Sequence, residues 1–327
     1  MTAYFLGGDV GGTHTRVLIA DQEGQTVGFG DAGSGNHEGV GYEGFIAALR
    51  EATQEALTNA GLSFQDITAA GLGIGGYDWP SQRQPHLDAL RKLGYSMPYE
   101  IVNDAVIGLI AGSADGWGVG VVSGTGCNCW GWDRTRQHIG HVTGGGMWMG
   151  EAAGSGELVS QAVQAVAHEW TGRGPATRLT PALVEFAGAM SLEDLLEGLM
   201  DIRYHMRASA ARLVFQVAQE GDPVAVNIIR WAGNELGELA KTVIRQLHFQ
   251  ELSFDVVLIG SMFEGGPLLI EPMRQTVQAF APQAKLVRLG APPVVGAVLL
   301  AMEQAGIQPD LAIRNRLFET ERTNASF

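Results

Sequence analysis

Two stretches of this chain share one pattern at an offset of 112 residues (121 minus 9), and this repeat limits the folds open to it. Residues 9–28 read DVGGTHTRVLIADQEGQTVG, and residues 121–140 read VVSGTGCNCWGWDRTRQHIG. In both, an apolar strand runs into a small-residue turn and the strand pattern then resumes, as in a β-hairpin with a glycine tip. The repeat predicts a duplicated α/β domain.

The tips of the two hairpins have a composition that suits anions. Residues 11–13 are Gly-Gly-Thr and residues 124–126 are Gly-Thr-Gly. Glycine lets successive backbone N–H groups converge on one point, an arrangement that binds phosphate oxygens, and Thr13 and Thr125 each add a hydroxyl. One such hairpin is most often only a turn, but two copies at one offset predict two phosphate-binding hairpins that face each other across a cleft.

Composition excludes several classes of protein. A chain of 327 residues with 46% apolar residues can bury two cores. Its formal net charge of −14 argues against a nucleic-acid or anionic-membrane surface. The chain shows no signal segment and no apolar run of the ~20 residues that cross a bilayer, which predicts a cytoplasmic protein. Cys127 and Cys129 are expected to remain reduced thiols.

The first half reads as βββαβαβα, one half of a duplicated α/β protein. After the hairpin and a third strand near 27–30 comes a glycine-rich loop that contains Asn36 and is too irregular for secondary structure. Periodicity then predicts, in order, a helix over 43–59, a strand over 67–74, a helix over 82–93, a strand over 99–102 and a helix from Ala105. The strand over 67–74 ends in GIGGYDWP, an irregular tip with an aromatic cluster.

The small, acidic segment 112–118 is the predicted hinge. It divides the chain into a first domain over 1–115 and a second over 116–305, with a C-terminal helix or tail over 306–327 that could pack on the first domain. The second domain is predicted to hold a helix over 157–170, a strand over 254–259 that Gly260-Ser261 ends, a helix over 268–280, a strand over 285–289 and a helix over 294–303.

With these motifs placed, the chain resembles the N-acetylglucosamine kinase-like members of the BadF/BadG/BcrA/BcrD ATPases, within the superfamily of sugar kinases, heat-shock proteins and actin. The motifs that carry the resemblance run nearly end to end: DVGGTHTR, GSGNH, IVNDA, SGTGCNC, GSMFEGGP and PPVVGAVLLA. The resemblance implies two actin-like (ribonuclease H-like) domains that flank a nucleotide cleft. It also implies ATP and Mg²⁺ as cofactors, a homodimer, and transfer of the γ-phosphate to an amino sugar. N-acetylglucosamine, converted to its 6-phosphate, is the first choice, and glucosamine or another hexose comes next.

The resemblance also assigns residues. The phosphates of ATP would contact Gly11, Gly12, Thr13, Gly124, Thr125 and Gly126, and the adenosine would lie beside Ala218, Gly260 and Ser261. The sugar would contact Asn36, Cys127, Asn128, Gly145 and Glu151. At the last of these the chain departs from the family, which often has Gly-Asp-Glu-Gly-Ser where residues 150–155 read GEAAGS, one residue longer and with Glu in place of Asp.

Two carboxylates are candidates for the chemistry. Asp104 follows a strand and precedes a helix, so it could accept the proton of the attacking hydroxyl, or it could simply cap the helix that starts at Ala105. The paired hairpins favour the base, and a helix N-terminus is expected to keep it ionised at neutral pH. Asp9 could hold a water on Mg²⁺, or it could be a turn residue that accepts backbone N–H bonds.

The sequence lacks the motifs that three other functions would require. A family ATPase that drives electron transfer without a sugar substrate would carry cluster-binding cysteines, and a zinc-containing sugar kinase would carry a zinc-binding set. A sugar-responsive regulator would bring a helix-turn-helix and a basic face. His37, His138 and His141 do not have the spacing of a metal site. Tryptophans at 79, 130, 132 and 148 could stack on a sugar, but packing is their more frequent role, so none is assigned to the site.

Overall fold

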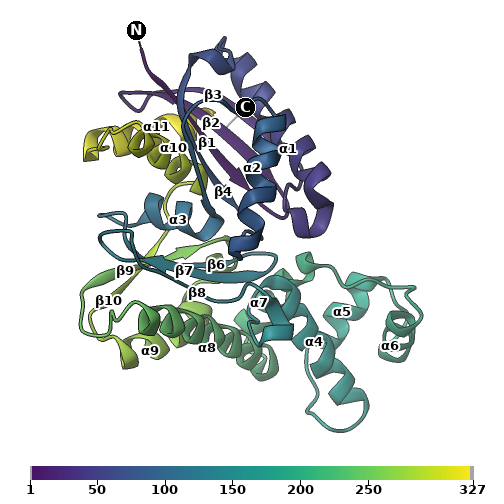
Figure 1. The fold of residues 1–327 in the computed structure, drawn as a ribbon. Coiled ribbons are helices and arrows are strands. Elements are labelled where there is room, and N and C mark those ends of the chain that lie inside the picture. Colours follow the sequence, from purple (N-terminus) through teal and green to yellow (C-terminus); the bar gives the residue numbers. More distant parts are fainter. Residues whose placement is uncertain (1, 325–327) are drawn as a thin grey trace.

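The computed structural model describes residues 2–324, in which two five-stranded sheets have the same topology (Figure 1). The first sheet has the order β3-β2-β1-β4-β5 and the second the order β10-β9-β6-β7-β8. In each, three antiparallel strands are followed by two parallel ones. The strands are β1 (Tyr4–Val10), β2 (Thr15–Asp21), β3 (Thr26–Ala32), β4 (Ile67–Ile74), β5 (Tyr99–Asn103), β6 (Gly118–Ser123), β7 (Cys127–Trp132), β8 (Ile139–His141), β9 (Phe254–Ile259) and β10 (Ala284–Arg288). The prediction of a duplicated, actin-like α/β fold is therefore confirmed.

Helices cover both faces of the first sheet because its strands are apolar on both sides. Leu6 and Ile19 face one way and join a core with α1 (His37–Ala60), next to which α2 (Arg83–Lys92) packs, whereas Phe5 and Leu18 face α10 (Pro293–Gln304). Gly7 is required at this contact, since a Cβ there would lie 2.5 Å from the backbone nitrogen of Val298. Strand β1 thus lies directly against α10.

The second sheet is covered by α8 (Pro223–Gln246) on one face and by α3 (Asp104–Gly112) on the other, and α9 (Pro267–Phe280) packs on α8 (Figure 1). A helical group projects beside this sheet: α4 (Ser155–Trp170), α5 (Leu179–Ala187), α6 (Leu192–Met200) and α7 (Ala211–Gln219). The two halves meet where α3 crosses α10. At the crossing, a Cβ on Gly296 would lie 1.8 Å from the carbonyl oxygen of Ile107, so only glycine allows it.

The elements expected from periodicity are present within about two residues of their predicted bounds, with one main difference. Helix α1 begins at His37 rather than at 43, because the Asn36 side chain accepts a hydrogen bond from the Glu38 N–H (2.9 Å), and Gly41 (φ +68°) breaks it after one turn. The C-terminal segment forms α11 (Leu311–Asn324), where Thr320 Oγ1 lies 3.0 Å from Thr26 Oγ1 on β3. No helix within residues 2–324 is both long and apolar enough to cross a membrane.

Candidate active site

The two glycine turns meet in space. Residues 11–13 lie between β1 and β2, and residues 124–126 lie between β6 and β7. Across the gap, the Oγ1 atoms of Thr13 and Thr125 are 3.4 Å apart, and both side chains are exposed. The predicted facing hairpins are therefore present, at equivalent positions of the two repeats.

The turns leave room for a phosphate chain. A Cβ added at Gly12, Gly124 or Gly126 would meet no atom within 4 Å, so space adjoins these backbone groups. The second turn is also anchored from behind. The Gly124 carbonyl accepts a hydrogen bond from the Ser155 N–H (2.8 Å), and the Thr125 carbonyl accepts one from the Gly156 N–H (3.2 Å). Fixed backbone groups next to open space are what a nucleotide triphosphate requires.

The residues predicted beside the adenosine fall into two kinds. Gly260 and Ser261 are exposed where β9 ends, and Gly260 has φ +108° with the Ser123 carbonyl oxygen 2.3 Å from where a Cβ would lie. Ala218 is instead buried on α7 (3% exposed). Helix α7 adjoins the same turn, because a Cβ on Gly265 would lie 2.1 Å from the Phe215 ring.

Asp104 is the first residue of α3, and its neighbour provides the cap. The Asn103 side chain is the N-cap, because its Oδ1 accepts a hydrogen bond from the Ala105 N–H (2.9 Å). One oxygen of Asp104 accepts from the same N–H (2.9 Å), and its other oxygen lies 3.3 Å from where a Cβ on Gly75 would be. Asn103 therefore occupies the N-cap position, and Asp104 shares the Ala105 N–H with it.

The protonation of Asp104 also differs from the expectation. Burial, followed by the charges of Asp9 and Asp78, raises its pKa from 3.8 to about 7, although hydrogen bonds at the helix N-terminus oppose the shift. Asp104 is thus not fully ionised at neutral pH. Burial likewise raises the pKa of Asp9 to about 6, against the attraction of Arg16 and His14. Two carboxylates near neutrality are typical of a functional site.

Asp9 fits a role beside a magnesium ion. It lies on β1 just before the first glycine turn, and its negative charge contributes to the raised pKa of Asp104. Within residues 2–324 there is no group of three or more His, Cys, Asp or Glu side chains that could hold a metal. Asp9 could hold one of the waters of Mg²⁺, because this ion keeps several waters and is otherwise bound by phosphates.

A third buried carboxylate, Asp78, lies at the base of the site, called its floor below, and was not predicted from the sequence. Its Oδ1 accepts hydrogen bonds from Asn103 Nδ2 (3.0 Å), Asn128 Nδ2 (2.8 Å) and Trp130 Nε1 (3.4 Å). Burial, together with the charge of Glu38, raises the pKa of Asp78, while the bonds from Asn128 and Trp130 oppose the shift. The only signal in the sequence was a single Asp at the carboxyl end of a strand, in GIGGYDWP.

Asn36 and Asn128 lie on two sides of this floor. The Gly11 carbonyl accepts hydrogen bonds from the Gly35 and Asn36 N–H groups (3.1 and 3.2 Å), so the first glycine turn and the loop that carries Asn36 are joined. A Cβ on Gly76 would lie 2.5 Å from the side-chain oxygen of Asn36. Asn128 is fixed by its bond to Asp78 and by accepting the Cys129 N–H (2.8 Å).

The loop from 143 to 151 forms another wall. Oε1 of Glu151 accepts hydrogen bonds from the N–H and hydroxyl of Thr143 (2.7 and 2.9 Å), whereas its Oε2 is buried with no hydrogen-bond partner among the described residues. Gly145 is exposed in this loop, and a Cβ on Gly144 would lie 2.3 Å from Asp78 Oδ2. The loop therefore adjoins the floor, and an unpaired buried oxygen on Glu151 suits a donor from a ligand.

Cys127, between the second turn and Asn128, stays a neutral thiol. Burial raises its pKa to about 12. Cys127 and Cys129 are both free and lie two residues apart on β7, about 6.6 Å along the strand. Disulfides need their Cβ atoms at about 3.5–4.5 Å, so the two thiols do not pair.

Comparisons with known proteins agree with this geometry. The model of the BadF/BadG/BcrA/BcrD ATPase family matches residues 6–301. A curated relative from Clostridium acetobutylicum, the N-acetylmuramic acid/N-acetylglucosamine kinase, is 26% identical over 304 residues, which cover 92% of this chain and 99% of the relative. The N-acetyl-D-glucosamine kinase of Dictyostelium discoideum is 27% identical over 311 residues, with 91% and 97% covered.

Solved structures share the fold. A Chromobacterium violaceum protein, provisionally named an N-acetylglucosamine kinase, superposes with a TM-score of 0.66 at 23% identity over 91% of this chain and 98% of its own. A ROK family glucokinase from Streptomyces griseus, solved with glucose and AMPPNP, gives 0.60 at 18% identity over 93% of this chain and 100% of its own.

Proposed function

This chain belongs to the BadF/BadG/BcrA/BcrD ATPase family, and on that premise we propose that it is an ATP-dependent sugar kinase. It transfers the γ-phosphate of ATP to the 6-hydroxyl of N-acetylglucosamine. The observation that carries this proposal is the contact between Thr13 and Thr125, which sets two phosphate-binding turns against each other beside a carboxylate that titrates near neutrality. The names of both curated relatives include N-acetylglucosamine kinase activity, which supports the choice of sugar.

On the donor side, the two turns hold the phosphates. Backbone N–H groups at Gly12, Thr125 and Gly126, with the hydroxyls of Thr13 and Thr125, donate hydrogen bonds to phosphate oxygens, while the Gly124 N–H donates to the Gly126 carbonyl (2.9 Å) and closes the turn. Phosphoryl transfer depends mainly on position and on stabilising the developing charge, so fixed donors of this kind contribute directly to the rate. Gly260 and Ser261 are exposed where the adenosine would extend, and α7, which carries Ala218, flanks them.

On the acceptor side, Asp104 orients the sugar hydroxyl and takes its proton. The hydroxyl oxygen forms a bond to the γ-phosphorus, the bond from that phosphorus to the ADP oxygen breaks, and the proton passes to Asp104. A base with a pKa near the working pH is close to optimal for such a transfer. Asn36, Cys127, Asn128, Gly145 and Glu151 surround the sugar, and the unpaired Oε2 of Glu151 accepts one of its hydroxyls.

Mg²⁺ completes the proposal, with Asp9 as the residue that holds one of its waters. When bound, the ion neutralises charge on the β- and γ-phosphates. Removal of Mg²⁺ by a chelator should therefore abolish turnover, and Asp9→Asn should raise the Mg²⁺ concentration that gives half-maximal rate.

Three broader features belong to the same proposal. The chain divides at 115 and 305, and the segment 112–118 is a hinge about which the cleft closes, which small-angle scattering with sugar and an ATP analogue would detect as compaction. The protein is a homodimer, a state that light scattering would measure. Its place is the cytoplasm, where the free thiols Cys127 and Cys129 remain reduced.

ADP release against a panel of sugars tests the activity. The panel contains N-acetylglucosamine, glucosamine, glucose and no sugar. We expect release that depends on sugar and is fastest with N-acetylglucosamine. A preference for glucosamine or glucose would mean that the protein is a sugar kinase with a different substrate. Equal release with and without sugar would instead indicate an ATPase of this family that has no sugar substrate.

A further inference from the structure

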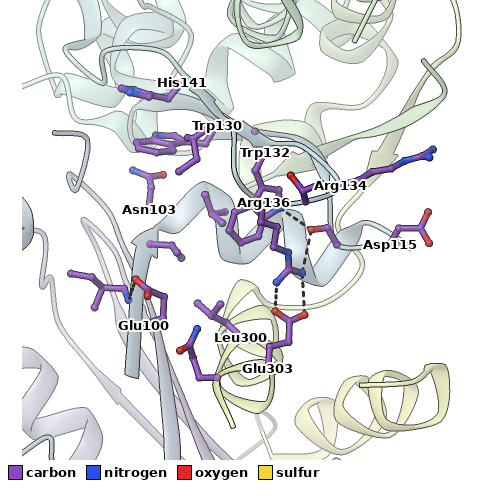
Figure 2. A pocket seen from close by; sticks show the side chains of 18 of the residues that line it. Glu100, Asn103, Asp115, Trp130, Trp132, Arg134, Arg136, His141, Leu300 and Glu303 are labelled. Atoms are coloured by element: carbon purple, nitrogen blue, oxygen red, sulfur yellow. Dashed lines mark hydrogen bonds and ion pairs between the residues drawn. The ribbon is translucent and has the colours of Figure 1, made fainter. Parts of the chain in front are cut away.

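A pocket of about 1040 Å³ lies between the two halves of the chain, beyond the floor of the acceptor site (Figure 2). Its walls come from β5, the β4–α2 loop and α10 on one side, and from β7 and β8 on the other. Neither glycine turn lines it, nor do Gly260 and Ser261, so it is separate from the nucleotide site. Pockets of this size at domain junctions commonly hold small molecules.

Strand β7 leads from the acceptor site into this pocket. Because side chains alternate along a strand, Asn128, Trp130 and Trp132 share one face, while Gly131 on the other packs against α8. Successive members of this row are about 6.6 Å apart. Asn128 is the member of this row nearest the second glycine turn. Trp130 comes next, beside Asp78, and Trp132 lies inside the pocket.

The pocket lining includes several aromatic side chains and two ion pairs, Arg83 with Glu100 and Arg136 with Glu303. Trp79 lines the pocket and is 47% exposed. Exposing so large an apolar side chain to water is energetically unfavourable. Arg136 bonds both carboxylate oxygens of Glu303 and lies 4.6 Å over the Trp132 ring (Figure 2). Aromatic faces beside paired, planar polar groups suit a neutral ring that has both an apolar face and hydroxyl groups.

We propose that this pocket is a second sugar subsite, which holds a neutral N-acetylated hexosamine ring joined to the acceptor sugar through the acceptor's anomeric carbon. The inference rests on the proposed kinase function and extends its substrates to short amino-sugar oligosaccharides. Because the reacting 6-hydroxyl points to the phosphate turn, the remaining ring carbons lie farther along β7, toward Trp130. The transfer itself is unchanged: the bond to ADP breaks, the bond to the 6-oxygen forms, and Asp104 takes the proton.

Kinetics with one and two rings test the subsite. We would compare N-acetylglucosamine with di-N-acetylchitobiose, measuring turnover, competition between the two, and the mass of the phosphorylated product. Trp79→Ala and Ile139→Ala remove exposed apolar surface from the pocket (47% and 56% exposed), so folding should be little affected. Trp170→Ala is the matched control, because Trp170 is 56% exposed at the end of α4, outside the pocket.

We expect the disaccharide to bind, as a substrate or as a competitor of N-acetylglucosamine, and the Trp79→Ala, Ile139→Ala double variant to weaken that binding about 10-fold or more. The same variant should leave the KM for N-acetylglucosamine within about 2-fold, and Trp170→Ala should change neither. If the enzyme phosphorylates N-acetylglucosamine but the disaccharide does not bind, or binds equally to the double variant, the subsite is wrong. If neither sugar is phosphorylated, the proposed function itself fails.

Discussion

The hydroxyl oxygens of Thr13 and Thr125 lie 3.4 Å apart although 112 residues separate them in the chain. Each threonine occupies the same position in its copy of the repeat. Their contact brings the two copies together at one point, so a single phosphate chain can reach donors from both. The duplication thus accounts for the location of the site as well as for the fold.

Replacing these threonines should weaken ATP use. Thr13→Val and Thr125→Val each remove one hydroxyl donor, and each should lower kcat/KM for ATP by about 10-fold or more, the equivalent of one hydrogen bond to a charged group. Both side chains are exposed, so the melting temperature should hardly change. Thr13→Ser and Thr125→Ser keep the hydroxyl and serve as controls. If the Val variants have the same ATP kinetics as the unaltered protein, Thr13 and Thr125 do not contribute to phosphate binding.

Asp104→Asn should reduce kcat by about 100-fold or more, the range usual for a lost general base. The KM for ATP should stay close to that of the unaltered protein, because Asp104 faces the acceptor. The acid limb of kcat/KM should have its midpoint near pH 7, the pKa of Asp104, and should disappear in the variant. Near-normal turnover in Asp104→Asn would contradict the mechanism.

The same substitution should change how stability depends on pH. Asp104 titrates at about 7 in the folded protein and at about 3.8 when unfolded, so between these values the folded state binds more protons. Stability therefore falls as pH rises through this window, and Asp9, with a pKa of about 6, acts in the same direction. Asp104→Asn should melt higher than the unaltered protein at pH 8 and equally at pH 4. A lower melting temperature at pH 8 would contradict this electrostatic account.

Asp78→Ala should impair sugar binding more than ATP binding. The change removes the carboxylate oxygen that accepts hydrogen bonds from Asn103 and Asn128, so Asn128 loses its fixed orientation. We expect the sugar KM to rise about 10-fold and the ATP KM to stay unchanged, with a loss of roughly 2 kcal/mol in stability for a disrupted buried hydrogen-bond network. Trp130→Phe, which removes only the longest of the three bonds, is the milder control. Equal rises in both KM values would mean that Asp78 is only structural.

The fold was largely predictable, because hydrophobic periodicity and the glycine repeat are local signals. Asn103 and Asp104 both fit an N-cap pattern, however, and only the structure shows that Asn103 is the cap and Asp104 the first residue of the helix. The role of Asp78 depends on partners 25 to 52 residues away, which no local pattern reveals. The crossing of α3 and α10 at Gly296 likewise depends on tertiary packing.

The acceptor site should reject anionic sugars. Its glycine-rich floor adjoins three acidic side chains, Asp78, Asp104 and Glu38. Glu38 Oε2 lies 3.0 Å from where a Cβ on Gly76 would be. Burial lowers the pKa of His37, so this side chain stays neutral. A carboxylate on the substrate would be repelled by the ionised acidic groups, and the neutral His37 would not attract it. The kcat/KM for N-acetylglucosamine should therefore be about 100-fold or more higher than the kcat/KM for N-acetylmuramic acid, which is its lactic acid ether. Comparable values for the two sugars would refute this prediction.

The central claim is that this protein moves phosphate from ATP to a sugar hydroxyl. The most direct measurement follows ADP and N-acetylglucosamine 6-phosphate together in one reaction with Mg²⁺. The account predicts equal amounts of the two products at every time point, and no ADP when the sugar is left out. ADP without sugar phosphate, or a phosphate on any position other than the 6-hydroxyl, would contradict it.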